Sequence, residues 1–245
     1  MQSFILRYGT HSQIGVSTAV AEHYSSHLNL QNVKVIHNAF PIHHVQQEIK
    51  PDQIRAGYGI APTDFLMIMP GRLSPEKNHN VLLEALTILR EKKLYPRLLI
   101  VGDGPLRDSL NNKIVKEQVI LHHGIPNQEL KRLMQVADVL VMPSISEGFG
   151  LVHAEAMSVS TPVIATRVGG VTDLIEDGTS GLLVPSGDAV SLAKKIALLM
   201  TNPKLQEQLG QAGRKRIETC FSADVIANKY INFYTNIIRN SKCVE

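Results

Sequence analysis

From residue 65 onward, short apolar runs alternate with segments of helical length, and this alternation constrains the fold more than any other feature. The runs are rich in Val, Ile and Leu, as in strands that are buried on both faces of a sheet. We predict strands at 65–69, 97–101, 119–122, 138–142, 162–166 and 181–184. We predict helices at 51–58, 80–91, 106–116, 127–136, from 151, and at 189–200, 203–218 and 223–239. Such alternation implies a parallel sheet with right-handed crossovers, so we expect an α/β, doubly wound fold.

Polar or glycine-containing loops follow the predicted strands. These loops are 71–77, 102–105, 122–126, 144–150 and 166–170. The carboxyl ends of parallel strands meet at one edge of a sheet, and α/β proteins bind ligands in the crevice beyond that edge. The sequence therefore predicts that several distant loops assemble one ligand site.

The central stretch runs from Ser144 to Glu155, directly after an apolar run that Pro143 ends. Its two glycines allow the backbone to approach a ligand closely, and the first amides of the following helix are unpaired and attract anions. Glu147 in the loop and Glu155 in the helix can both face the crevice. The alternative is an ordinary strand-to-helix turn with one capping and one surface carboxylate.

Arg72 and Lys77 lie on the loop after the strand at 65–69. A guanidinium binds phosphate oxygens in a bidentate manner, and an ammonium supplies a point charge. Two solvated cations on a polar loop are the alternative. The helix terminus that we expect at the same edge favours an anion site.

Other residues give weaker signals. The segment Gly102–Gly104 resembles half of a dinucleotide fingerprint, but the third glycine is missing, so NAD binding is poorly supported. His122 and His123 lack further ligands at the spacing of a metal site. His153 is predicted to pack or cap a helix. An acidic group before Gly178 is read as the solvated end of a helix: Asp173, Glu176 and Asp177.

Composition excludes several classes of protein. Of 245 residues only two are cysteines, so we expect no disulfide framework and a reducing, cytoplasmic compartment. A net charge of +3 is too small to indicate nucleic acid, and no apolar run is long enough to span a membrane. Residues 1–45 hold one predicted helix, capped by Ser17 or Thr18, and one strand at 33–37. These two elements cannot bury their own faces, so they must dock elsewhere.

A family resemblance joins these motifs, which occur in one order: Gly71–Lys77, Val101–Pro105, Ala137–Asp138, Pro143–Ser144, Glu147–Leu151, Glu155–Ala156 and Gly178–Val184. Together they closely resemble the carboxyl-terminal domain of retaining glycosyltransferases of family 4, the glycogen-synthase-like group with the GT-B fold. Glu147 and Glu155 match the family's two glutamates separated by seven residues. The resemblance extends over about residues 10–240.

The resemblance implies two Rossmann-like domains that face each other across a cleft. Residues 1–45 would be the end of the amino-terminal domain and the linker, and 46–220 the nucleotide-sugar-binding domain. Residues 221–245 would form a helix that crosses back toward the amino-terminal domain, which would be supplied in cis or in trans. The partners implied are a nucleotide-diphosphate sugar, with UDP, GDP or ADP left open, and a carbohydrate or lipid-linked acceptor. Such an acceptor is compatible with peripheral contact at the inner face of the membrane.

The resemblance also assigns roles to residues. Arg72 and Lys77 would hold the diphosphate, Glu147 the hydroxyls of the donor sugar, and Glu155 the ribose hydroxyls. Glycine turns would border the base, and backbone amides would bind phosphate and sugar oxygens. The remaining donor-binding positions are Gly71, Gly102, Gly104, Gly124, Ile125, Gly148, Phe149, Gly150, Leu151 and Val152.

The implied reaction breaks a sugar–phosphate bond, so negative charge grows on the leaving diphosphate. Two cations and a helix terminus directed at that charge would stabilise the transition state without a metal or another cofactor. The family is understood to attack from the same face as the leaving group, so the glutamates are not the acid and nucleophile of a glycosidase. The alternatives are a non-catalytic nucleotide-sugar-binding module that lacks its acceptor domain, an epimerase on the same fold, and, least supported, a dehydrogenase.

Overall fold

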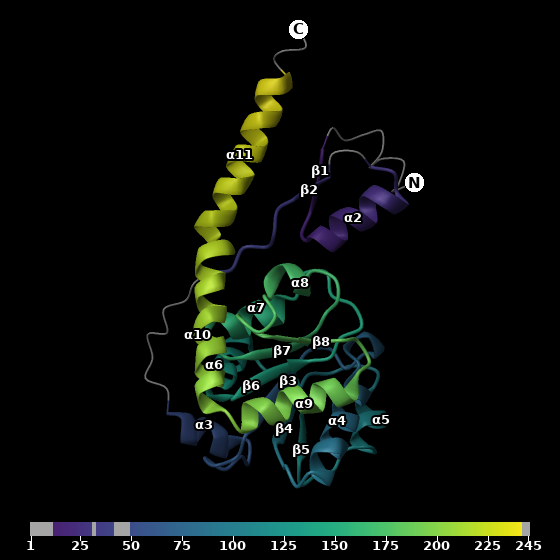
Figure 1. Cartoon of the computed structure of the whole chain (residues 1–245), viewed down its shortest axis with the longest axis vertical. Coiled ribbons are helices and arrows are strands. Elements are labelled where there is room, and N and C mark those ends of the chain that lie inside the picture. The colour runs from purple at the N-terminus through teal and green to yellow at the C-terminus, as the bar shows by residue number, and fades with distance from the viewer. Residues whose placement is uncertain (1–11, 31–32, 42–49, 242–245) are drawn as a thin grey trace.

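A six-stranded parallel sheet forms the centre of the protein, in the order β5-β4-β3-β6-β7-β8. The structure, a computed structural model, describes residues 12–30, 33–41 and 50–241 (Figure 1). The strands of this sheet are β3 (Leu66–Pro70), β4 (Arg97–Val101), β5 (Val119–His122), β6 (Val139–Met142), β7 (Val163–Thr166) and β8 (Leu182–Val184). The prediction of an α/β, doubly wound parallel sheet is confirmed.

The helices of this domain connect the strands and cover the sheet. They are α3 (Pro51–Gly57), α4 (His79–Glu91), α5 (Arg107–Asn111), α6 (Asn127–Val136), α7 (Leu151–Ser158), α8 (Val171–Leu174), α9 (Ala189–Met200) and α10 (Pro203–Cys220), with a 3-10 turn at Pro75–Lys77. Helix α4 packs against α9, whereas α7 packs against α6 and α10. The chain moves outward from β3 to β5 and later from β6 to β8, so right-handed crossovers place α4 and α7 on opposite faces.

Some predicted elements differ from the structure. The helix expected to reach Lys116 ends at Asn111, because a second asparagine follows and asparagine favours turns over helix interiors. The amides of Lys113 and Ile114 both donate to the Leu110 carbonyl, and the chain then turns into β5. A strand at 13–15 was not predicted, because an element of three residues is too short to show periodicity. The helix expected to end at Gly178 is the short α8, which ends at Leu174.

The amino-terminal segment forms a small unit beside the main sheet. It consists of β1 (Gln13–Gly15), α2 (Thr18–His27) and β2 (Val33–Val35), and its two strands pair in parallel. Ser17 caps α2 as expected, because its hydroxyl accepts the amide of Val20 at 3.2 Å. Figure 1 shows α2 next to α8, with the strands alongside the last helix. A two-stranded sheet is not stable alone, so this unit depends on its neighbours.

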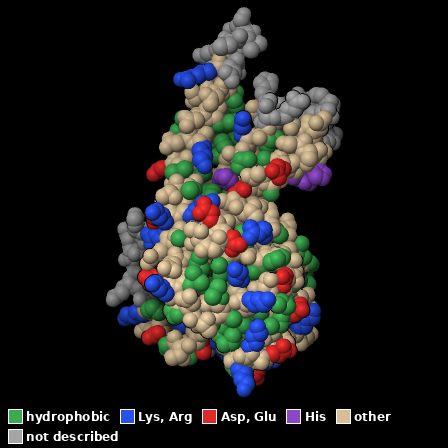
Figure 2. Space-filling model, viewed as in Figure 1, with side chains coloured by type: hydrophobic (Ala, Val, Ile, Leu, Met, Phe, Trp, Pro, Cys, Tyr) green, Lys and Arg blue, Asp and Glu red, His purple; other side chains and the backbone are tan. Residues whose placement is uncertain are grey.

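The last helix, α11 (Ala223–Ser241), extends well beyond the domain (Figure 1). Apolar side chains line it, and Ile231, Tyr234 and Ile238 are 60%, 55% and 57% exposed. Figure 2 shows such side chains along this projecting part. No helix in the described part of the chain has the length and hydropathy needed to cross a bilayer.

Candidate functional site

The two central strands, β3 and β6, define the position of the candidate site. They are neighbours in the sheet, and the connections that follow them lead in opposite directions. The crevice at such a switch point is the usual ligand site of a doubly wound fold. The loop after β3 carries Lys77, and the loop after β6 carries Glu147. The amide of Ile145 donates to the Glu76 carbonyl at 2.8 Å, which joins the two loops.

Lys77 and Glu147 meet directly in this crevice. The Lys77 ammonium donates to Oε1 of Glu147 at 2.7 Å, and the Ser144 hydroxyl donates to the same oxygen at 2.8 Å. The side chains of Lys77 and Glu147 are 20% and 13% exposed, so the pair is shielded yet still reachable from solvent. Among the described residues no hydrogen bond reaches Oε2 of Glu147, which leaves that oxygen available to a ligand hydroxyl.

The environment keeps Glu147 ionised. Burial alone would raise its pKa, but the Lys77 hydrogen bond, the neighbouring His153 and the Ser144 hydroxyl together lower the pKa below its usual value. The carboxylate is therefore a permanent acceptor near neutral pH.

Helix α7 begins beside this pair with an open amino terminus. Its cap residue is Gly150, at φ +92°, and no side chain caps the helix. No hydrogen bond within the described residues uses the amides of Leu151 and Val152, so both remain available to an anion. Phe149 is buried, so only its backbone can meet a ligand. His153 is buried as predicted, but neither ring nitrogen has a hydrogen-bond partner among the described residues, although Gly150 lies against the ring.

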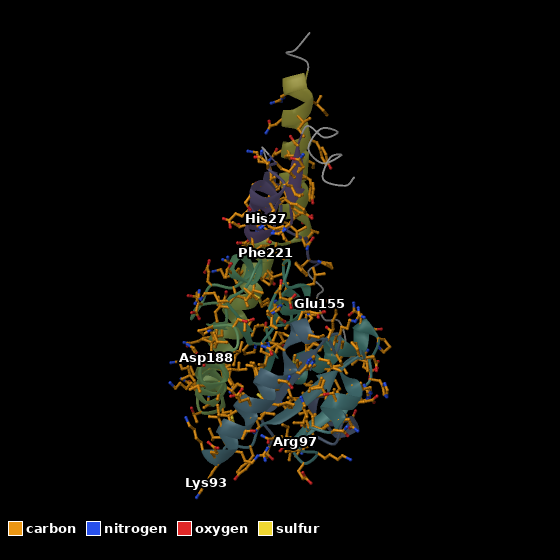
Figure 3. All side chains as sticks on the ribbon, turned by 90° about the vertical axis from the view of Figure 1, so that its right-hand side faces the viewer. His27, Lys93, Arg97, Glu155, Asp188 and Phe221 are labelled. Carbon is orange, nitrogen blue, oxygen red and sulfur yellow. The ribbon has the colours of Figure 1, made fainter. Side chains whose placement is uncertain are left out.

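Two further predicted residues, Arg72 on the loop after β3 and Glu155 on α7, have side chains that form no hydrogen bond or ion pair with a described residue. The half-buried carboxylate of Glu155 makes no hydrogen bond within the described residues. Burial raises its pKa, and Lys131 partly opposes the effect. Arg72 is exposed, and its side chain forms no ion pair with a described residue. In Figure 3, Glu155 lies toward the amino-terminal segment, whereas Arg97, at the start of β4, lies at the other end of the domain.

The glycine turns lie against each other as predicted for loops at one edge. A Cβ on Gly102 would lie 1.9 Å from the Gly71 carbonyl oxygen, and one on Gly104 would lie 2.5 Å from the Leu73 carbonyl oxygen. Only glycine therefore permits this approach between the loops after β3 and β4. Gly124 and Ile125 follow β5, the next strand outward.

Asp103 organises this side of the crevice, and sequence reasoning missed it. Its carboxylate accepts the Gly124 amide at 2.8 Å, His123 at 2.8 Å and Arg107 at 3.1 Å. The Gly124 hydrogen bond is the largest cause of its lowered pKa, followed by that of His123. An aspartate between two glycines, followed by an arginine four residues later, was the available signal.

The interpretation of the acidic group before Gly178 as a solvated helix end is only partly right: Glu176 and Asp177 are exposed, but α8 ends at Leu174 and the carboxylates have partners. The Glu176 carboxylate pairs with Arg216, and Asp177 pairs with Arg167 at 2.6 Å. Asp173 receives the amide of Thr18 at 2.6 Å. These partners lie 10 to 155 positions away in the sequence, beyond the range of a helical or turn pattern. Among the described residues, no group of three or more His, Cys, Asp or Glu side chains could hold a metal ion.

Comparisons with known proteins identify the family of this chain. The sequence profile of the family described as "Glycosyl transferases group 1" matches residues 51–216. The D-inositol 3-phosphate glycosyltransferase of Jonesia denitrificans is 34% identical over 191 residues, which cover 74% of this chain and 45% of that protein. Sucrose-phosphate synthase from Thermosynechococcus elongatus superposes with a TM-score of 0.83 at 25% identity, covering 98% of this chain and 61% of that chain.

A further structure shows the same fold. Anabaena Alr3699/HepE, solved in complex with UDP-glucose, has a TM-score of 0.84 at 22% identity and covers 95% of this chain and 65% of that chain. The chain spans less than half the length of the first curated relatives, 44% and 45%. The chain corresponds to the carboxyl-terminal part of retaining glycosyltransferases with the GT-B fold. It belongs to the glycosyl transferases group 1, which is family 4 of the glycosyltransferases.

Proposed function

We propose that this chain is the donor-binding part of a retaining glycosyltransferase, which transfers a sugar from a nucleotide-diphosphate sugar to a carbohydrate or lipid-linked acceptor. One observation carries the proposal: the Lys77–Glu147 pair lies at the switch point of the sheet, beside the uncapped start of α7. A cation, free amides and an ionised acceptor in one crevice suit a ligand that combines phosphate with hydroxyl groups.

Each part of the donor has a partner in this arrangement. Lys77 and Arg72 bind the diphosphate together with the amides of Leu151 and Val152. Glu147 accepts a hydroxyl of the donor sugar at its free Oε2, and Glu155 accepts the ribose hydroxyls. The turns at Gly102–Gly104 and Gly124–Ile125 border the base, which approaches their backbone.

The reaction follows from this placement of charge. The acceptor hydroxyl attacks the anomeric carbon from the face that the diphosphate leaves, the sugar–phosphate bond breaks, and the acceptor proton passes to a leaving phosphate oxygen. Lys77, Arg72 and the α7 amides stabilise the charge that grows on that group, so the reaction needs no metal for this task. Glu147 binds and orients the sugar and forms no covalent bond.

UDP-sugars are the first donors to test. HepE was solved in complex with UDP-glucose, and a TarM structure of Staphylococcus aureus was solved with UDP. The acceptor would be bound mainly by chain that precedes the described domain, as the short coverage of the relatives suggests.

The proposed organisation has three parts. Residues 1–45 are the end of the acceptor domain and the linker, 46–220 bind the donor, and 221–245 cross back toward the acceptor domain. The isolated β1–β2 pair supports this division, because it needs further strands or helices. A groove of about 560 Å³ between β2 and α11, lined by residues such as Lys34 and Phe233, offers a place for that domain.

Thermal unfolding of the chain with nucleotide ligands tests donor binding. UDP or UDP-glucose at 100 times its dissociation constant should stabilise the chain by about 2.7 kcal/mol and raise Tm by several degrees. NADH should produce no shift. If no nucleoside diphosphate or its sugar shifts Tm, the proposed function is refuted.

The short coverage of the relatives also favours a second candidate, a binding module that does not catalyse transfer without its acceptor domain. Incubation of the 245-residue chain with radiolabelled donor separates the two. Sugar transfer or release by the chain alone would eliminate the module. Binding without turnover would support it.

A further inference from the structure

The carboxylate of Asp173, on α8, contacts two segments that lie far away in the sequence. Its Oδ2 accepts the amide of Thr18 at 2.6 Å and lies 3.2 Å from Nε2 of His37. The Asp173 and His37 side chains are only 16% and 18% exposed, so solvent weakens the contact between them little, whereas Thr18 is exposed. Both partners belong to the part of the chain that precedes the donor-binding domain.

The contact with Thr18 fits the electrostatics of a helix start. Thr18 is the first residue of α2, where backbone amides lack helical partners and a negative charge is favourable. Ser17 caps the same helix and is completely buried. The Asp173 carboxylate therefore joins the amino terminus of α2 to α8, while Ser17 caps α2 itself.

Beneath this contact lies the loop that carries Glu147. The amide of Gly170 donates to the Glu147 carbonyl at 3.1 Å. A Cβ on Gly170 would lie 2.7 Å from the Ser17 Cβ and 2.3 Å from the Gly148 carbonyl oxygen. Gly170 is thus enclosed between the start of α2 and the Glu147 loop, and movement of one requires movement of the other.

His37 contacts the same loop from another side. Its ring lies 5.4 Å from the Phe149 ring and 5.3 Å from the Phe221 ring, measured between centroids. Phe149 is part of the Glu147 loop. Of the two groups that Asp173 contacts, His37 therefore packs on that loop directly, whereas Thr18 follows Ser17, which lies against Gly170. Figure 3 shows Phe221 at the junction between the domain and the amino-terminal segment.

Asp173 itself is firmly supported. Arg216 of α10 donates to the carbonyls of Asp173 and Leu174 at 2.9 and 2.7 Å, and it pairs with Glu176. Arg216 thus fixes the backbone that carries the Asp173 carboxylate.

We propose that Asp173 is a positioning residue that couples the seating of the amino-terminal segment to the conformation of the Glu147 loop. The part of this inference that concerns the donor rests on the proposed function. A ligand that orders the Glu147 loop then tightens the seating of α2, and the seated segment strengthens ligand binding by the same factor, because coupling between sites is reciprocal.

Amide hydrogen exchange by NMR on the 245-residue chain tests the coupling. The probes are the amides of Thr18 and Gly170, and the amide of Ile68 in β3 reports global unfolding. In Asp173→Asn without ligand, we expect exchange at both probes to accelerate about tenfold or more, as for loss of a charge-assisted hydrogen bond. Exchange at Ile68 should change far less. Asp173→Glu should restore much of the protection, and Asp224→Asn, an exposed acid on α11, should not alter it.

UDP provides the second arm of the test. In the native chain UDP should slow exchange at Thr18 about fivefold or more, the lower range of allosteric coupling. In Asp173→Asn, UDP should no longer protect Thr18 and should bind several times more weakly. If the role of Asp173 were purely structural, Asp173→Asn would change the exchange rate of the Thr18 amide in the unliganded chain, but UDP would still slow that exchange.

The outcomes separate the two proposals. If Asp173→Asn without ligand accelerates amide exchange at Thr18 but leaves the exchange at Gly170 unchanged, the coupling is overturned whether or not UDP binds. If UDP binds but does not protect Thr18 in the native chain, the link to the donor is overturned. If UDP and UDP-sugars fail to bind at all, the proposed function fails, and the unliganded arm still decides whether Asp173 joins the two segments.

Discussion

The Lys77 ammonium and the Glu147 carboxylate lie 2.7 Å apart, although 70 positions separate them in the sequence. They come from the loops after the two central strands, β3 and β6. Glu147 shares one oxygen between Lys77 and Ser144 and keeps the other available. The pair therefore holds both side chains in place before a ligand arrives.

Removal of Lys77 should weaken both donor binding and turnover. In the chain joined to its amino-terminal domain, Lys77→Ala should lower kcat/KM by about 10²–10³, the effect of losing one stabiliser of developing charge. Steady-state kinetics with a UDP-sugar checks this. Lys92→Ala, an exposed lysine at the end of α4, is the matched control and should retain activity. Equal rates for Lys77→Ala and the native enzyme would remove Lys77 from the mechanism.

The same variant should change the titration of Glu147. Native Glu147 has a lowered pKa, so its ionised form persists until the pH falls below the usual glutamate range. Without Lys77 the effect of burial dominates, and the pKa of Glu147 should rise. NMR titration of the Glu147 side chain should show its midpoint at a higher pH in Lys77→Ala. A midpoint at the same pH in both proteins would contradict the assigned cause.

Two buried histidines should make the protein less stable in acid. Burial is the main reason that the pKa of His153 and that of His79 both fall to about 4. An unfolded histidine titrates near pH 6.5, so the unfolded state binds more protons between these values and stability falls as pH decreases from about 6.5 to 4. Each histidine contributes up to about 1.4 kcal/mol per pH unit in this window.

Replacement of one of these histidines isolates its contribution to the loss of stability in acid. His153→Leu should flatten the fall in unfolding free energy between pH 6 and 4.5, measured by urea denaturation. At pH 7 it should be as stable as the native chain or more stable, because two buried nitrogens without hydrogen bonds are removed. A slope identical to that of the native protein would show that His153 does not titrate with a lowered pKa.

Arg55 should be the most important charged residue for stability at the other end of the sheet. It is 8% exposed, bonds to the Val136 carbonyl at 2.7 Å, and pairs with Asp138 at 2.9 Å. Arg55→Met leaves the Asp138 carboxylate without its cation and should cost about 3–5 kcal/mol in urea unfolding. Arg167→Met, which breaks the more exposed pair with Asp177, should cost about 1 kcal/mol or less. Similar losses in both variants would contradict this ranking.

A methyl group at Gly102 should damage the site more than the core. The new Cβ would lie 1.9 Å from the Gly71 carbonyl oxygen, so the loops after β3 and β4 must separate. Gly102→Ala should therefore weaken UDP binding about tenfold or more, on the order of 1.4 kcal/mol. Gly57→Ala, on α3, meets no atom within 4 Å and should be neutral or stabilise the chain slightly. Calorimetric titration with UDP distinguishes these outcomes.

Much of the fold could be predicted from the sequence. The runs at 97–101, 119–122 and 127–136 coincide with β4, β5 and α6, because apolar periodicity and turn residues are local signals. Strand β1 was missed, since an element this short carries no period. The helix predicted to reach Lys116 was too long, because two asparagines in succession outweighed the apolar residues beyond them.

By itself, the sequence determined the type of fold, the family and the edge of the sheet at which the candidate site lies, because strand alternation and loop motifs are encoded by neighbouring residues. The tertiary structure alone decided which side chains meet: Lys77 with Glu147, Asp103 with the Gly124 amide, and Asp173 with Thr18. Such pairs join residues from tens to more than a hundred positions apart. Their contact depends on strand order and on close packing between loops, which no local pattern specifies.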